Sequence, residues 1–144
     1  MRYYADSSFL VSCYLLDANT SRAKSYLGGL GAPLVFTSLQ ALEVGNAFEL
    51  GVFRGLFSRA DATAVRANLE LDLRSDHLVK TSVNWPLAFR VASALSKRHS
   101  ATAGTRSMDI LHVAAAKSLR SSEFISFDGR QRLLVTGLGL RVAP

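Results

Sequence analysis

The chain has 144 residues, of which 49% are hydrophobic; this is enough to bury one core, so we expect a single domain over residues 1–144. The 17 Lys and Arg residues exceed the 11 Asp and Glu residues by six, which favours an anionic partner such as nucleic acid. One cysteine excludes an internal disulfide and a thiolate metal cage, and no apolar run has the length of a membrane span, so we expect a cytoplasmic protein without membrane contacts.

Short apolar runs bounded by turn residues alternate with helical patterns along the chain. The predicted strands are residues 3–5, 34–37, 77–81, 123–127 and 138–142. The predicted helices are residues 9–16, 21–27, 39–56, 58–73, 84–99 and 106–117, with breakers at 28–33, a flexible loop at 100–105 and a short helical segment after the turn 128–131. This alternation predicts an α/β fold in which a parallel sheet has helices on both faces.

Acidic residues follow the first two strands. Asp6 directly follows the first strand, where open α/β sheets bind ligands, although a cap for the next helix is the simpler role for one Asp. Thr37 and Gln40 have the spacing of a capping box for helix 39–56, which is so apolar that we expect it to be packed on most sides. Glu43 lies near the start of that helix. If buried it needs a cationic partner, whereas at the surface it would only complement the helix dipole.

The second half of the chain supplies two further acids. Asp109 lies in the first turn of the alanine-rich helix 106–117, where it also complements the helix dipole. His112 follows three residues later on the same helix face, so an Asp–His metal pair is conceivable; with no second histidine nearby, we expect a packed or hydrogen-bonded His112. Asp128 directly follows the fourth strand and begins a turn into a helical segment.

By strand polarity, Asp6, Glu43 and Asp128 reach one edge of the sheet, and Asp109 joins them if its helix opens there. Four carboxylates brought together repel one another unless a divalent cation neutralises them. Oxygen ligands without a cysteine or histidine cluster favour Mg²⁺ or Mn²⁺ over Zn²⁺. An acidic, metal-charged pocket within a basic surface suits phosphodiester chemistry.

Four segments that contain these acids form a recognisable set. They are Tyr4-Ala5-Asp6-Ser7-Ser8, Leu42-Glu43, Arg106-Ser107-Met108-Asp109-Ile110-Leu111-His112-Val113-Ala114 and Ser126-Phe127-Asp128. Together they resemble a PIN domain and, in this size class, the toxin ribonuclease of a VapBC-type toxin–antitoxin pair. The Arg-x-x-Asp-x-Leu-His-x-Ala stretch is the most specific of the four, and the resemblance spans nearly the whole chain.

The resemblance implies a PIN-like three-layer αβα sandwich with a central, mainly parallel five-stranded sheet. It also implies a Mg²⁺- or Mn²⁺-dependent endoribonuclease that acts on RNA, is inhibited by a small antitoxin protein and is usually a homodimer. Asp6 and Asp109 would be the principal metal ligands, Glu43 a ligand or the group that orients a metal-bound water, and Asp128 the more variable fourth acid. The family often has Thr-x-Asp where this chain has Ser126-Phe127-Asp128, and the serine keeps the hydroxyl.

Two other interpretations compete with a nuclease. A phosphotransferase or phosphatase with Asp6 as its nucleophile needs a second carboxylate two residues later, where the chain has Ser8. A non-catalytic PIN-like module that binds RNA or a protein would have lost one of the acids, and none is missing.

Basic and aromatic residues near these acids have open roles. Arg106 and Arg130 could contact RNA phosphates, or could equally be solvated or pair with an antitoxin. Tyr14, Phe48 and Phe53 fall on apolar helical stripes, so we expect them in the core or a dimer interface and not as platforms for base stacking.

Overall fold

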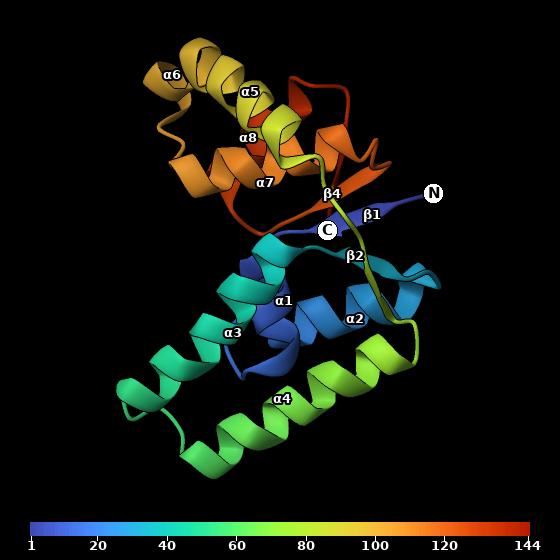
Figure 1. The fold of residues 1–144 in the computed structure, drawn as a ribbon, viewed down its shortest axis with the longest axis vertical. Coiled ribbons are helices and arrows are strands. Elements are labelled where there is room, and N and C mark those ends of the chain that lie inside the picture. The colour runs from blue at the N-terminus through green and yellow to red at the C-terminus, as the bar shows by residue number, and fades with distance from the viewer. The chain divides into compact units, whose positions relative to one another are not determined.

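The computed structural model describes residues 1–144 and contains five strands of three residues each (Figure 1). The strands are β1 (Tyr3–Ala5), β2 (Leu34–Phe36), β3 (Leu78–Lys80), β4 (Glu123–Ile125) and β5 (Arg141–Ala143). The helices are α1 (Ser7–Tyr14), α2 (Thr20–Leu30), α3 (Ser38–Phe53), α4 (Arg59–Arg74), α5 (Trp85–Leu95), the π-helical segment η1 (Ser96–Ser100), α6 (Ala101–Ala103), α7 (Ser107–Ser118) and α8 (Gly129–Thr136). None of the helices is both long enough and apolar enough to cross a membrane.

The five strands form one sheet in the order β3-β2-β1-β4-β5. The pairs β1–β4, β4–β5 and β2–β3 are each parallel. Parallel strands need helical crossovers, and helices separate all of these strands along the chain. The predicted α/β fold with a five-stranded parallel sheet is therefore confirmed.

The chain forms two compact units, which we describe separately. The α7 unit contains residues 1–6 and 82–144, and the α3 unit contains residues 7–81.

The core of the α7 unit is built on β1, β4 and α7. The ring of Tyr4 stacks on Phe124 of the neighbouring strand, with ring centres 5.8 Å apart, and meets His112 of α7 edge to face. The alanines at 114–116 are fully buried, so α7 has no bulky side chains there to hold its neighbours away. Helix α5 packs along α7. Because α7 is packed in the core of this unit, the position of its first turn, which contains Asp109, is fixed.

The α3 unit is a cluster of helices beside β2 and β3. Helix α3 packs against α1 and α4, and Phe48 is fully buried with Tyr14 against its ring. The predicted capping box is confirmed, because Thr37 accepts a hydrogen bond from the Gln40 backbone and the Gln40 side chain accepts from the Thr37 backbone. This cap explains why α3 begins directly after β2.

The expectation that α3 is packed on most sides is wrong. Leu42 is 69% exposed and Phe53 is 87% exposed, so one stripe of the helix contacts its neighbours while the other is open. The prediction of a core or interface position therefore holds for Phe48, whereas Phe53 is not in the core of this chain. Apolar composition did not distinguish a helix that is buried all round from one with an exposed apolar face.

Two predicted breaks are helical in the structure. Helix α2 runs through Gly28 and Gly29 and ends only at Gly31, whose φ of 61° allows a left-handed cap. The predicted loop 100–105 is also mostly helical, since η1 and α6 continue α5 up to Gly104, whose φ is 63°. In both places a glycine with positive φ follows the helix, which ends three residues later than predicted for α2 and four residues later for α6.

Candidate functional site

Strands β1, β4 and β5 end together at one edge of the α7 unit. The backbone nitrogen of Asp6 donates to the carbonyl oxygen of Ile125 at 3.0 Å, and that of Ser126 donates to Ala143 at 2.9 Å. Asp6 is the residue directly after β1, and only 3% of its surface is exposed. A buried carboxylate at the carboxyl end of a parallel strand is the arrangement that the sequence predicted for this residue.

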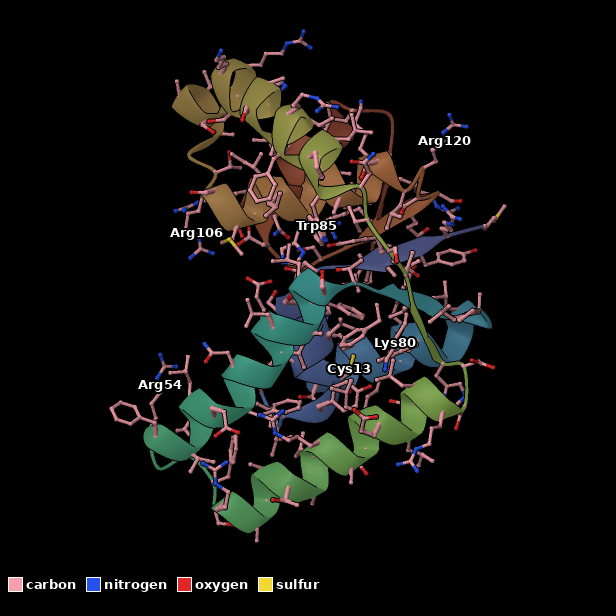
Figure 2. All side chains as sticks on the ribbon, viewed as in Figure 1. Cys13, Arg54, Lys80, Trp85, Arg106 and Arg120 are labelled. Atoms are coloured by element: carbon pink, nitrogen blue, oxygen red, sulfur yellow. The ribbon has the colours of Figure 1, made fainter.

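Asp109 lies in the first turn of α7 and is also buried. Its Oδ2 accepts from Arg106 Nε at 2.9 Å, and its Oδ1 accepts from Gln131 Nε2 at 3.2 Å. The hydrogen bond to Asp109, together with its negative charge, raises the pKa of the exposed Arg106 guanidinium. Figure 2 shows Arg106 at the start of α7. One oxygen of Asp109 thus accepts from the buried side chain of Gln131, and the other accepts from the exposed side chain of Arg106.

Gln131 is a functional candidate that the sequence analysis missed. It is 1% exposed, and its Oε1 accepts from the Ser126 hydroxyl at 2.8 Å while its Nε2 donates to Asp109. The Ser126 hydroxyl in turn accepts from the backbone nitrogen of Asp128 at 3.0 Å. The available signal was the glutamine three residues after a helix-capping Asp, a position whose side chain can fold back toward the start of its helix.

Asp128 has a structural role at the start of α8. Its Oδ1 accepts from the backbone nitrogens of Arg130 and Gln131 at 2.8 and 3.1 Å, so Asp128 is the N-cap of this helix. Through Gln131 and Ser126 it belongs to the same hydrogen-bond network as Asp109. The side chain of Arg130 is exposed and reaches the Gly104 carbonyl oxygen at 3.5 Å.

Glu43 belongs to the α3 unit and is half-buried on α3. Its Oε2 accepts a short hydrogen bond, 2.6 Å, from the hydroxyl of Ser7. Ser7 is the residue after Asp6 in the sequence and the first residue of α1. The hydroxyl–carboxylate bond fixes one oxygen of Glu43 in a polar contact inside the α3 unit.

The two units thus hold the predicted site residues separately. The α7 unit contains Asp6, Asp109 and Asp128 with Arg106 and Arg130, and the α3 unit contains Glu43. Within either unit, no three His, Cys, Asp or Glu side chains lie close enough together to hold a metal ion.

His112 is packed and hydrogen-bonded, as the sequence analysis expected. Its Nδ1 and the hydroxyl of Tyr4 are 2.8 Å apart, and the residue is buried. Its ring also meets the ring of Tyr4 edge to face. This contact joins α7 to β1 inside the α7 unit.

The donor set of these residues fits a hard divalent cation. Asp6 and Asp109 offer carboxylate oxygens at buried positions, and a bound cation would add to the compensation of negative charge that Arg106 gives Asp109. Gln131 is a neutral hydrogen-bond donor that orients Asp109 without neutralising it, as side chains behind metal ligands commonly do. These residues fit Mg²⁺ or Mn²⁺ better than a metal that prefers sulfur or imidazole ligands.

No protein-family model matches the chain, and no curated protein matches it. Solved structures do match its fold over nearly the full length. One is VapC20 of Mycobacterium tuberculosis, described as a toxin that cleaves the sarcin-ricin loop; the match covers 91% of this chain and 93% of that one, with a TM-score of 0.66 and 19% identity. Another is FitAcB from Neisseria gonorrhoeae, with 99% and 96% covered, a TM-score of 0.70 and 13% identity. The chain therefore has the fold of these proteins, and the predicted VapC-like, PIN-like fold is confirmed.

Proposed function

We propose that this chain is a Mg²⁺- or Mn²⁺-dependent endoribonuclease, the toxin of a type II toxin–antitoxin pair. The observation that carries the proposal is the burial of two carboxylates, Asp6 after a parallel strand and Asp109 in a first helical turn, in a fold shared with a toxin described as cleaving the sarcin-ricin loop.

In this proposal each acid has a role that its contacts support. Asp6 and Asp109 would hold the cation, and Gln131 and Arg106 keep the Asp109 carboxylate in one orientation. Glu43 would be the third acid, oriented by Ser7, the neighbour of Asp6 in the chain. Asp128 would be the fourth and least direct, because its carboxylate already caps α8.

A divalent cation in such a site supplies a nucleophilic water at neutral pH and stabilises the leaving oxygen. The protein must also bring a polyanion to a cluster of acids. The net charge of +6 favours this approach, and Arg106 and Arg130, exposed beside Asp109 and Asp128, are suited to phosphate contacts. Hydrolysis by water leaves no 2′,3′-cyclic phosphate, which distinguishes this reaction from attack by the ribose 2′-hydroxyl.

The partners in the proposal are the RNA substrate, a small antitoxin protein and a second copy of the chain. Support for a protein partner comes from large apolar side chains that are exposed to solvent, including Leu42 and Phe53 on α3 and Leu56 after it. Such exposed apolar groups are typical of protein contacts when they gather on one surface. The proposed setting is the cytoplasm.

The test is cleavage of a mixed panel of structured RNAs by purified, antitoxin-free protein with Mg²⁺, Mn²⁺ or EDTA. We expect cutting only with metal, without cyclic phosphate ends. The substitutions Asp6→Asn and Asp109→Asn should each reduce the rate by at least 10²-fold, because each removes a charge that would bind the cation.

Asp76→Asn is the matched control. Asp76 is exposed and has a φ of 56°, a conformation that asparagine also tolerates, so this variant should cut at the wild-type rate. If the wild type cuts nothing, or cuts equally in EDTA, the proposal is wrong. Metal-independent RNA binding without cleavage would instead identify a binding module of the same fold.

A further inference from the structure

A hollow of about 530 Å³ lies in the α7 unit, between α5 and the start of α7. From α5 it is lined by Phe89, Ala92 and Ser93, which follow the spacing of one helix face, and from η1 by Ser96, Lys97 and Ser100. The remaining lining residues are Thr105, Ser107, Met108, Ile110 and Leu111. The hollow therefore reaches the residues on either side of Asp109 in the chain.

We propose that this hollow binds an unpaired RNA nucleotide next to the cleaved phosphate, with its base against Phe89 and Met108 and a phosphate on Lys97. The inference rests on the proposed ribonuclease function and names a contact that would select single-stranded substrate. The volume of the hollow lies within the usual range for small-ligand sites.

Exposed stacking surface is the first argument. Phe89 is a large aromatic residue of α5 that is 57% exposed, and Met108 is 42% exposed. Single-stranded RNA is recognised largely by stacking unpaired bases on such side chains. The five hydroxyl residues of the lining, Ser93, Ser96, Ser100, Thr105 and Ser107, provide donors and acceptors for base edges.

Charge is the second argument. Lys97 is the one charged residue of the lining, and no carboxylate accompanies it. Residues 84–108 contain Arg90, Lys97, Arg98 and Arg106 and no Asp or Glu. A stretch with four cations and no acid, leading to the buried acid Asp109, matches a phosphate chain that runs toward the metal site better than it matches a protein partner.

The backbone is the third argument. Lys97 and Ser100 belong to a π-helical turn, and such turns occur frequently at functional sites. Because α5, η1 and α6 follow one another without a break, the hollow has a wall of continuous helical backbone. Thr105, which shares a hydrogen bond with Ser100 at 3.3 Å, connects this wall to the start of α7.

Binding can be measured without catalysis, in EDTA, by fluorescence anisotropy of a labelled 12-nucleotide RNA of mixed sequence, alone or annealed to its complement. We expect the single strand to bind more tightly than the duplex. Phe89→Ala should weaken single-strand binding about 5- to 100-fold, the range for losing one base–aromatic stack, and Phe89→Tyr should restore it. Lys97→Ala should also lower the salt dependence, by a slope of about 0.7.

The controls are chosen by chemistry. Leu16→Ala removes a large apolar side chain that is more exposed than Phe89, and Lys117→Ala removes an exposed cation from the last turn of α7; both should bind within twofold of wild type. Trp85, the only tryptophan and one turn before Phe89 on α5 (Figure 2), provides an intrinsic fluorescence signal for the same titration.

Equal binding of single strand and duplex, or wild-type binding by Phe89→Ala and Lys97→Ala, would overturn the proposed nucleotide site. So would light scattering that shows Phe89→Ala converting a dimer to a monomer, since the hollow would then be a contact between copies. These results are separable from failure of the proposed function. If the wild type cuts RNA and Phe89→Ala has the wild-type KM, only the proposed nucleotide site is refuted. If the wild type does not cut RNA but its RNA binding still depends on Phe89, only the nuclease function is refuted.

Discussion

Replacement of Gln131 by leucine tests whether the buried network behind Asp109 positions that carboxylate. Leucine has a similar size but removes the amide that donates to Asp109 and the oxygen that accepts from Ser126. Both Gln131 and Ser126 are essentially inaccessible to water, so solvent cannot replace the lost partners. The same substitution leaves the backbone cap from Asp128 in place.

The expected loss of stability follows from these two hydrogen bonds. The bond to an ionised carboxylate is worth roughly 1.5–3 kcal/mol, and the unpaired serine hydroxyl costs about 1–3 kcal/mol. Burial of the leucine side chain offsets part of this, about 1–2 kcal/mol. The free energy of unfolding should therefore fall by about 2–4 kcal/mol, which corresponds to a decrease in Tm of roughly 5–15 °C for a chain of this size.

The second effect concerns the metal. Loss of a side chain that orients a metal ligand typically weakens metal affinity about 10- to 100-fold, so the Mg²⁺ concentration for half-maximal RNA cleavage should rise by that factor. Thermal unfolding by circular dichroism and a Mg²⁺ titration of cleavage measure the two effects separately.

Leu134→Ala is the control for general destabilisation. Leu134 is buried on the same helix, and its truncation should cost about 2–5 kcal/mol through loss of apolar contacts alone. This variant should keep the wild-type Mg²⁺ dependence. If both variants change the Mg²⁺ dependence equally, or if Gln131→Leu changes neither quantity, Gln131 does not position Asp109.

Three further predictions concern the thiol, a helix cap and a buried hydroxyl. Burial raises the pKa of Cys13 to about 12 from 9.0, so iodoacetamide should modify the folded chain at pH 8 about 10³-fold more slowly than the unfolded chain. The raised pKa favours the protonated thiol in the fold, so its contribution to stability is complete below pH 9 and is lost as the pH rises toward 12. Thr37→Ala removes the cap of α3 and should lower the unfolding free energy by about 1 kcal/mol in urea titrations. Tyr4→Phe removes the buried hydrogen bond to His112 and should lower it by about 1–2 kcal/mol.

Each of these three has its own contradicting result. Equal alkylation rates with and without 8 M urea would show that Cys13 is accessible. Ser21→Ala changes an exposed residue of α2 and should stay within about 0.5 kcal/mol of wild type, so an equal effect at Thr37 would refute the cap. Tyr3→Phe is the control for Tyr4, since the Tyr3 hydroxyl donates only to the Met1 sulfur, at 3.4 Å. An equal effect of Tyr3→Phe and Tyr4→Phe would refute a contribution of the hydrogen bond to His112.

The sequence predicted those parts of the fold that depend on neighbouring residues. Thr37 and Gln40 are three residues apart, and their capping box forms as expected. The position of Asp6 after β1 follows from a short apolar run ended by polar residues, and the parallel sheet follows from the alternation of strands with helices. Local hydrogen bonding and periodicity decide these features, so they can be read in a window of a few residues.

Only the tertiary structure decided which side chains contact the candidate acids and which apolar residues are exposed. Gln131 and Asp109 are 22 residues apart, and no periodic pattern relates them; they meet because α7 and α8 pack together. The exposure of Phe89 and the hollow beside it also depend on how α5 packs on α7, because the same helical stripe could equally have been buried. Burial and contact between distant segments are properties of the packed chain, so the sequence named the candidate acids whereas packing determined the side chains that hold them.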